Sequence, residues 1–309
     1  MRAQTPTAVR EPSPTLLERF PVLQRGLDRL EHRPLAHGLA LWATGFVKPV
    51  FLDHLVTPRP RPESAPVREL LEEGREAYAK RLAGFLDHAD LLARIPVEGL
   101  ERGSTPYWGN SWLSPLDAVG LYGMLAEHRP ARYLEIGSGN STKFVRRAIT
   151  DLGLSTRITS IDPQPRAQID ALCDEVVRVP LQDADHAVFA ELEPGDVLFL
   201  DGSHRLHMGS DVLVFFSELL PRIKPGVLVQ VHDIMLPGDY PSAWRWRLYN
   251  EQYLLAALLT AAPQRFDVLL PNAFVHADPE LRTVLAPLWR RLGVTRHFDP
   301  GSFWWRHRG

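Results

Sequence analysis

Five apolar runs that alternate with helix-like segments constrain the fold more than any other feature of this chain. They lie at residues 132–137, 157–162, 175–180, 196–201 and 226–233. Strands that alternate with helices form a parallel sheet that helices cover on both faces. Two further strand patterns, 265–275 and 301–307, follow a long helical pattern at 244–262. The prediction is an α/β, doubly wound, mostly parallel sheet of seven strands, with the two C-terminal strands as an antiparallel hairpin at its edge.

The first hundred residues have a different pattern. Residues 1–15 show no hydrophobic periodicity and are predicted to form a disordered tail. Residues 16–104 are dominated by apolar positions at helical spacing, interrupted by the proline-rich stretch 56–66. We therefore expect an N-terminal helical extension over 16–104 and an α/β domain over 105–309. The extension would either cap a substrate pocket or pair subunits in a homo-oligomer, and the sequence does not distinguish these roles.

Charge and composition restrict the class of protein. The formal net charge of −2 shows no electrostatic signature of nucleic-acid or anionic-membrane binding. The single cysteine, Cys173, excludes an intrachain disulfide. The N-terminus has no apolar signal region, and the most apolar run, 253–262, is too short to span a bilayer. These features predict a soluble cytoplasmic protein with no nucleic-acid or membrane partner.

Polar side chains follow all five apolar runs, where each strand would end. In an open parallel sheet, ligands bind outside the carboxyl ends of the strands. The residues at those ends are Glu135 to Ser141, Asp162, Gln182 to Asp185, Asp201 to His204, and His232 with Asp233. Their coincidence predicts a ligand site at this edge of the sheet.

The loop "GSGNST" after the first run is the most specific of these ends. Gly137 and Gly139 are expected to allow positive φ and to let a ligand approach the backbone, while a helix that begins near Ser141 offers its N-terminus to an anion. Asp162, 23 residues beyond Gly139, is placed to accept the hydroxyls of a ribose. Thr142 occupies the position of the third glycine of a dinucleotide loop. An adenosine-type ligand with a carboxylate or phosphate fits this pattern, and a tight turn without a ligand is the alternative.

The motifs "YLEIGSGNST", "SIDPQP", "LFLDGSH" and "IKPGVLVQVHDI" resemble those of class I S-adenosylmethionine-dependent methyltransferases, which have a Rossmann-like fold. The closest resemblance is to a bacterial small-molecule subgroup that shares "SHRLHMGSDV" and "NEQYLLAALL", and it covers about 105–275. It implies methyl transfer to a hydroxyl, less favourably an amine, of a small molecule, with secondary metabolism as one setting.

The resemblance also implies how S-adenosylmethionine would be held. Asp162 would bind the ribose and Pro163 would lie near the adenine, with Gln182 and Asp183 near the adenine amine, although Asp183 fits a solvated turn equally well. Asp201 is also expected to bind the cofactor. The segment 107–122 would close over the cofactor through Trp108, Asn110 or Asp117, unless these residues serve packing and helix capping. The residues around the methionine part would be Glu135, Gly137, Ser138, Gly139 and Ser141.

Two histidines at strand ends are candidates for the base that removes a proton from the acceptor. Imidazole titrates near neutrality, which suits this role. His204 in "DGSH" is the first choice, and His232, beside Asp233 in "VHD", is the second.

A divalent metal at Asp201, His232 and Asp233 is an alternative use of the same residues. Oxygen and imidazole ligands admit magnesium, manganese or zinc. Similar macrolide-sugar O-methyltransferases hold a divalent ion at these strand ends. Because His232 stands where an acidic residue is expected, a metal is not favoured over a hydrogen-bonded His–Asp pair.

Two other classes of function remain open at this stage. One is an NAD-dependent oxidoreductase on the same scaffold, and the other is a non-catalytic adenosine-nucleotide-binding protein. The aromatic residues within 240–253 either roof a substrate pocket or pack against the N-terminal helices.

Overall fold

The computed structural model describes residues 59–165, 167–245, 247–294 and 299–309. The predicted tail and the part of the predicted extension before residue 59 lie outside these ranges. Residues 58–309 form one compact unit. The division predicted between residues 104 and 105 stays a prediction.

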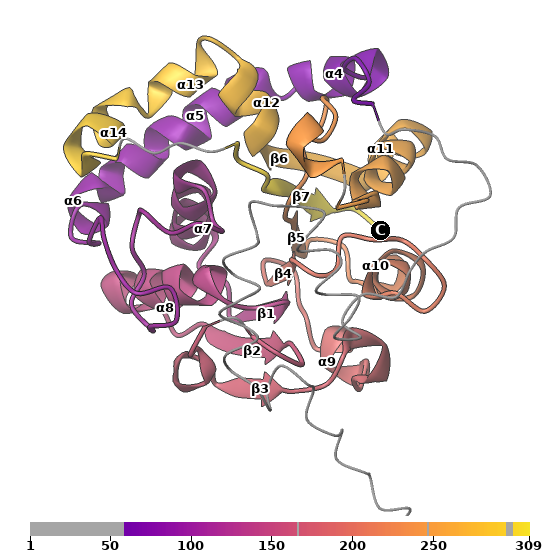
Figure 1. The fold of residues 1–309 in the computed structure, drawn as a ribbon, viewed down its shortest axis with the longest axis horizontal. Coiled ribbons are helices and arrows are strands. Elements are labelled where there is room, and N and C mark those ends of the chain that lie inside the picture. Colours follow the sequence, from indigo (N-terminus) through magenta and orange to yellow (C-terminus); the bar gives the residue numbers. More distant parts are fainter. Residues whose placement is uncertain (1–58, 166, 246, 295–298) are drawn as a thin grey trace, which may run out of the picture. The chain divides into compact units, whose positions relative to one another are not determined.

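A seven-stranded sheet forms the centre of this unit (Figure 1). The strand order is β3-β2-β1-β4-β5-β7-β6, with β7 antiparallel to both β5 and β6 and the other pairs parallel. This order confirms the predicted doubly wound fold with an antiparallel C-terminal hairpin. The strands are β1 (Arg132–Ile136), β2 (Arg157–Ile161), β3 (Glu175–Val177), β4 (Val197–Leu200), β5 (Leu228–Val231), β6 (Phe266–Pro271) and β7 (Phe303–His307).

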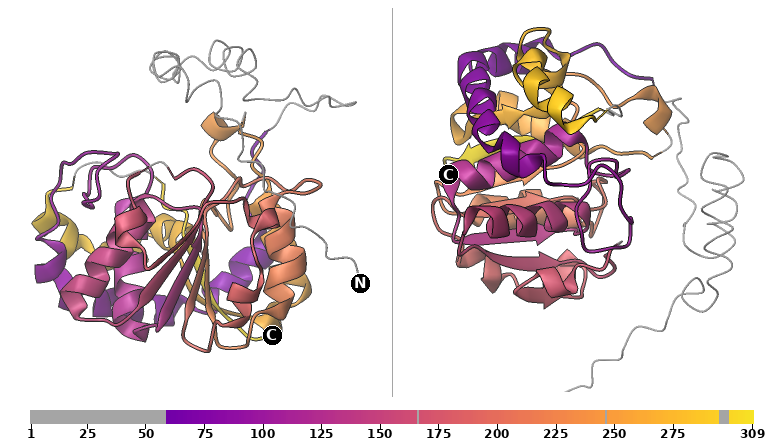
Figure 2. Two further views of the ribbon diagram at one scale, coloured as in Figure 1. Left: turned by 90° about the horizontal axis from the view of Figure 1, so that it is seen from below. Right: turned by 90° about the vertical axis from the view of Figure 1, so that its left-hand side faces the viewer.

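Helices cover both faces of the sheet (Figure 2). In Figures 1 and 2, α7 and α8 lie on one face and α10 and α11 on the other. β4 and β5 are buried at every position, as expected for strands between two helical layers. The helices are α4 (Ala65–Glu72), α5 (Arg75–Phe85), α6 (Ala89–Leu92), α7 (Pro115–His128), α8 (Asn140–Leu152), α9 (Ala187–Ala190), α10 (Asp211–Val214), α11 (Glu251–Ala261), α12 (Asn272–Ala277), α13 (Leu281–Val284) and α14 (Ala286–Leu292).

The C-terminal third differs in detail from the sequence-based expectation. The strand predicted at 265–275 ends at Pro271, and α12 begins at Asn272 because the Asn272 side chain is drawn into a buried hydrogen bond with Asp117. Three short helices, α12 to α14, occupy the connection that was expected to be a loop. The long helix predicted at 244–262 is regular only from Glu251, since Asn250 is bonded to the 204–206 loop.

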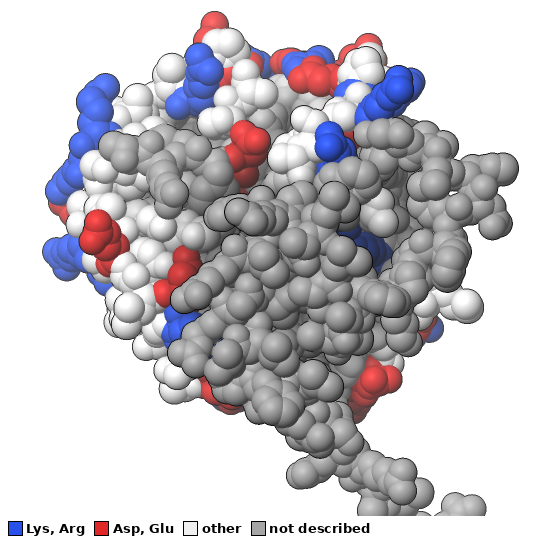
Figure 3. Space-filling model, in the orientation of Figure 1, with Lys and Arg blue, Asp and Glu red and all other residues white. Residues whose placement is uncertain are grey.

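The surface carries charges of both signs. In the described part of the face shown in Figure 3, Lys and Arg side chains are interspersed with Asp and Glu. Within the ranges that the structure describes, no helix is long and apolar enough to cross a membrane.

The packing of α5 against α7 can be tested with two glycines. A Cβ at Gly123 in α7 would lie 2.2 Å from the Phe85 ring, whereas a Cβ at Gly84 in α5 would meet nothing within 4 Å. We expect Gly123→Ala to lower the free energy of unfolding by about 1–3 kcal/mol through overpacking. Gly84→Ala should raise it by about 0.5–1 kcal/mol through helix propensity. Urea unfolding measures both, and equal effects of the two variants would contradict the described packing.

Candidate active site

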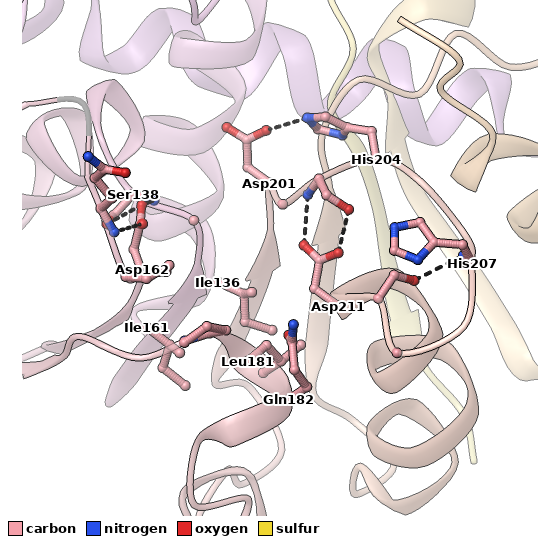
Figure 4. Close-up of a pocket in the computed structure, with 18 residues that line it drawn as sticks. Ile136, Ser138, Ile161, Asp162, Leu181, Gln182, Asp201, His204, His207 and Asp211 are labelled. Carbon is pink, nitrogen blue, oxygen red and sulfur yellow. Dashed lines mark hydrogen bonds and ion pairs between the residues drawn. The ribbon is translucent and has the colours of Figure 1, made fainter. Parts of the chain in front are cut away.

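A cavity of about 380 Å³ opens at the carboxyl ends of β1, β2 and β4 (Figure 4). Because the chain leaves β1 toward β2 on one side and β4 lies on the other, this is the point where the strand order reverses. Of the predicted site residues, those that line the cavity are Gly137, Ser138, Asp162, Pro163, Gln182, Asp201 and His204.

The glycine loop forms one wall of the cavity. Gly137 has φ +80°, and a Cβ there would lie 1.9 Å from the backbone oxygen of Asp201, so no other residue fits this position. Gly139 has φ 166°, which is extended backbone, so the left-handed conformation predicted at this position is not found. A Cβ at Gly139 would meet nothing within 4 Å, and this open space adjoins the start of α8.

Glu135 lies beneath the loop and is fully buried. It accepts hydrogen bonds from Thr142, from Ser141 at 3.2 Å and from Tyr133 at 3.3 Å. Burial outweighs these bonds and raises the pKa of Glu135 to about 8. The structure thus places Glu135 and Ser141 together as the support of the helix start, while the role predicted for them around the methionine part stays a prediction.

Asp162, at the end of β2, points toward the glycine loop (Figure 4). It accepts from the backbone and the hydroxyl of Ser138 at 2.9 and 3.2 Å and from the backbone of Gln164 at 2.8 Å. A carboxylate has about four lone-pair sites, so Asp162 keeps capacity for a further donor such as a ribose hydroxyl.

The third strand contributes through Leu181 and Gln182, which line the cavity. Asp183 is exposed at the end of a short 3₁₀ turn, with its backbone N–H bonded to Pro180. Its predicted contact with the adenine amine stays a prediction.

The segment before β1 packs over the glycine loop. Asn110 accepts a 3.1 Å hydrogen bond from Asn140, the first residue of α8, and a 2.7 Å bond from the backbone of Leu113. Trp108 is buried, with its ring 5.3 Å from that of Phe144. Asn110 therefore links this segment to the loop, whereas Trp108 is part of the core.

His204 lines the cavity, and buried groups orient it. Its Nδ1 contacts the fully buried carboxylate of Glu251, and its Nε2 lies 3.3 Å from Asp201 and 3.5 Å from Asp233. Burial alone would lower the pKa of His204, but these carboxylates together raise it well above its usual value. His204 also has φ +59°, a conformation that a non-glycine residue keeps only where its surroundings impose it.

His232 is held in the same way from the other side. Its Nδ1 lies 3.3 Å from Asp233 and 3.6 Å from Asp201, and its Nε2 lies 3.4 Å from the buried carboxylate of Asp117. Burial opposes the charged form, yet the surrounding carboxylates raise the pKa of His232 well above its usual value. Asp233, like His204, has a positive φ, +57°.

Asp201 is the most exposed carboxylate of this group. Its side chain is 36% exposed, against 16% for Asp233, so a ligand in the cavity meets Asp201 first. Burial would raise the pKa of Asp201, but His232 and His204 lower it far below its usual range. The result is an ionised carboxylate between two imidazoles.

The predicted metal residues Asp201, His232 and Asp233 are thus brought together at ion-pair distances. In the described part of the chain, no group of three or more His, Cys, Asp or Glu side chains has the arrangement of a metal site. The metal role of these three residues stays a prediction.

Sequence reasoning missed two residues that shape this site. Glu251, which orients His204, opens α11 47 positions later, and its sequence signals were an acidic residue at a helix start and its place in the motif "NEQYLLAALL". Asp211 accepts from the backbone and hydroxyl of Ser203 and thereby fixes the "DGSH" loop (Figure 4). Its signal was similar, since it follows Ser210 at the start of α10.

Comparison with known proteins finds a family match within the described part of the chain. Residues 134–234 match the family model described as a methyltransferase domain. This segment runs from β1 to just beyond β5 and contains most of the cavity wall. This segment is therefore similar to a methyltransferase domain, in agreement with the class I S-adenosylmethionine-dependent methyltransferase motifs recognised in the sequence.

Several solved structures are similar to this chain at low sequence identity. The Podospora anserina methyltransferase PaMTH1 bound to SAH has 15% identity and a TM-score of 0.38, covering 81% of this chain and 100% of that one. An O-methyltransferase from Bacillus cereus with SAH has 15% identity and a TM-score of 0.35, covering 67% and 83%. The plantazolicin methyltransferase BpumL with SAH and a pentazolic desmethylPZN analogue has 12% identity and a TM-score of 0.40, covering 77% of this chain and 99% of that one. No curated protein matches.

The buried Glu135 should make stability depend on pH. Because its pKa is about 8 in the folded state and about 4.5 when unfolded, the unfolded chain releases this proton first and stability falls as pH rises between these values. Glu135→Gln should remove this dependence. Relative to that variant, the wild type should lose up to about 1.4 kcal/mol of unfolding free energy per pH unit between pH 5 and 8.

Chemical denaturation at several pH values measures this difference. The exposed Glu218 provides the control, because Glu218→Gln should leave the pH dependence of the wild type intact. Parallel curves for the wild type and Glu135→Gln would show that Glu135 is ionised in the folded protein.

Proposed function

We propose that this protein binds S-adenosylmethionine in the switch-point cavity and transfers its methyl group to a hydroxyl, or less favourably an amine, of a small molecule. One observation supports this proposal most directly. The glycine loop, Asp162 and the oriented His204 all line the same cavity, and they lie within the segment that matches a methyltransferase domain. The cofactor supplies a methyl group already activated on a sulfonium.

The residues of the cavity fit this cofactor. Asp162 has spare acceptor capacity for the ribose hydroxyls, and the open space at Gly139 accommodates the methionine part against the backbone. Leu181 and Gln182 offer an apolar and a polar contact to the adenine. Asp201 presents a carboxylate to the positive charges of the amino acid and sulfonium groups.

His204 is proposed as the proton acceptor. In its neutral form, Glu251 would hold the proton on Nδ1, which leaves the Nε2 lone pair on the side of Asp201 and the cavity. As the carbon–oxygen bond forms and the carbon–sulfur bond breaks, the acceptor proton passes to Nε2. Glu251, Asp201 and Asp233 together stabilise the resulting imidazolium, which is the physical origin of the raised pKa of His204.

His232 has a supporting part in this proposal. Unlike His204, it is not among the residues that line the cavity, and Asp117 holds its Nε2 away from Asp201. Its positive charge keeps Asp201 ionised beside His204.

Cofactor binding can be tested with SAH. Isothermal titration should show binding to the wild type, and Asp162→Asn should weaken it about tenfold by removing a charged acceptor. Gly139→Ala should weaken it as well without lowering the unfolding midpoint, since its Cβ meets no protein atom. The exposed Asp185 serves as control, and Asp185→Asn should bind SAH as the wild type does. Binding of NAD but not of SAH would favour the oxidoreductase alternative.

The proton-acceptor role predicts a pH profile. Because His204 accepts a proton only after losing its own, methyl transfer should increase as the pH approaches the raised pKa of His204. Glu251→Gln removes the carboxylate that contributes most to this increase in the pKa, so the rise in activity should move to lower pH. His204→Gln should lower kcat about 100-fold or more, whereas His276→Gln, at an exposed position on α12, should not.

NMR titration of the imidazole signals measures the pKa of His204 directly, and radiolabelled methyl transfer to a panel of phenols and amines measures the rates. An unchanged pH midpoint in Glu251→Gln would remove Glu251 from the mechanism. SAH binding without transfer to any acceptor, in both the wild type and His204→Gln, would favour a non-catalytic binding protein. Loss of activity with EDTA, restored by magnesium, manganese or zinc, would favour the metal role of Asp201, His232 and Asp233.

A further inference from the structure

An aromatic cluster adjoins His204 on the segment that leads into α11. The Tyr249 ring lies 4.4 Å from the imidazole of His204, centre to centre, with an interplanar angle of 38°. Tyr240 and Trp244 each lie 5.9 Å from Tyr249 and 6.1 Å from one another. Because His204 lines the cavity, these rings adjoin the wall where the acceptor atom would lie.

The side chains of two arginines lie over the rings of this cluster. The guanidinium carbons of Arg205 and Arg247 lie 5.4 and 5.5 Å from the centre of the Tyr249 ring, and that of Arg247 lies 4.3 Å from the ring of Trp244. The Nε of Arg205 donates to the backbone oxygen of Arg247 at 2.8 Å, which links the Arg205 side chain to the backbone of the segment that carries Arg247. None of the ion pairs among the described residues includes Arg205 or Arg247.

Hydrogen bonds link the segment that carries these side chains to the loop that contains His204. The N–H of Asn250 donates to the oxygen of His204 at 3.0 Å, and the Asn250 side chain accepts from the backbone of Leu206 at 2.5 Å. Leu248, between Arg247 and Tyr249, has φ +54° while its side chain is 44% exposed. An exposed apolar side chain on strained backbone indicates a conformation held by its surroundings and is typical of functional sites.

We infer that these residues form an anion-recognition patch for the acceptor: Arg205 and Arg247 bind a carboxylate or phosphate group, and Tyr249 with Trp244 contacts the planar ring that carries it. Guanidinium groups match the geometry of both anions through paired N–H donors, and stacking on aromatic rings holds them in place. The acceptor is thus a hydroxylated aromatic anion. This inference rests on the proposed function, because that function places the reacting hydroxyl of the acceptor next to His204.

The test uses three phenols that differ in one substituent. We expect 4-hydroxybenzoate or 4-hydroxyphenyl phosphate to bind the SAH-saturated full-length protein at least about tenfold more tightly than the neutral 4-hydroxybenzamide, by calorimetry. Whichever of the two anions binds identifies the group as carboxylate or phosphate. The double variant Arg205→Gln, Arg247→Gln should lose this preference while its SAH affinity stays unchanged.

Two further variants serve as controls for this test. Arg222→Gln changes an exposed arginine just before β5, at the opposite edge of the sheet, and should keep the preference for the anions. Arg247→Lys retains the charge and should keep part of the preference if the double variant does not fold. Equal binding of the three phenols, or a preference that survives in the folded double variant, would overturn the inference. Anion preference without SAH binding would instead contradict the proposed function and leave the patch in place.

Discussion

The buried carboxylate of Asp117 is the interaction on which the rest of this site depends. It accepts hydrogen bonds from Ser114 at the start of α7, from Asn272 at the start of α12, and from the backbone of Gly301 and Ser302 before β7. It also faces His232 after β5. Burial would raise the pKa of Asp117, but His232 and these donors lower it, so the charge persists in the core. One side chain thereby sets the positions of four elements that are distant in sequence.

Asp117 belongs to a network of carboxylates and imidazoles that extends from the core to the cavity. Each imidazole has one nitrogen on a fully enclosed carboxylate, Asp117 for His232 and Glu251 for His204, and its other nitrogen near Asp201 and Asp233. The enclosed carboxylates fix the orientation of the rings, and Asp201, which lines the cavity, faces both of them. Such a network is stable only when its members are present together, because removing one partner leaves a buried charge unpaired.

The sequence predicted local features well and long-range ones poorly. The run at 132–137 and the strand-to-helix turn that follows it were predicted correctly, because a buried strand and a strand-to-helix turn each leave a local pattern. The run at 265–275 was read as one strand, although the structure ends it at Pro271. The reason is the bond between Asn272 and Asp117, residues that lie 155 positions apart. Glu251 was missed for the same reason, since its partner His204 lies 47 positions away.

Sequence alone determined the alternation of strands and helices and the position of the cavity at the strand ends, because hydrophobic periodicity and glycine at a tight turn act over a few residues. Only the tertiary structure decided which histidine lines the cavity, which carboxylates orient the two rings, and where Arg205 and Arg247 meet Tyr249. Those relations depend on side chains that the sheet order brings together, and a linear pattern carries no information about the distances between them.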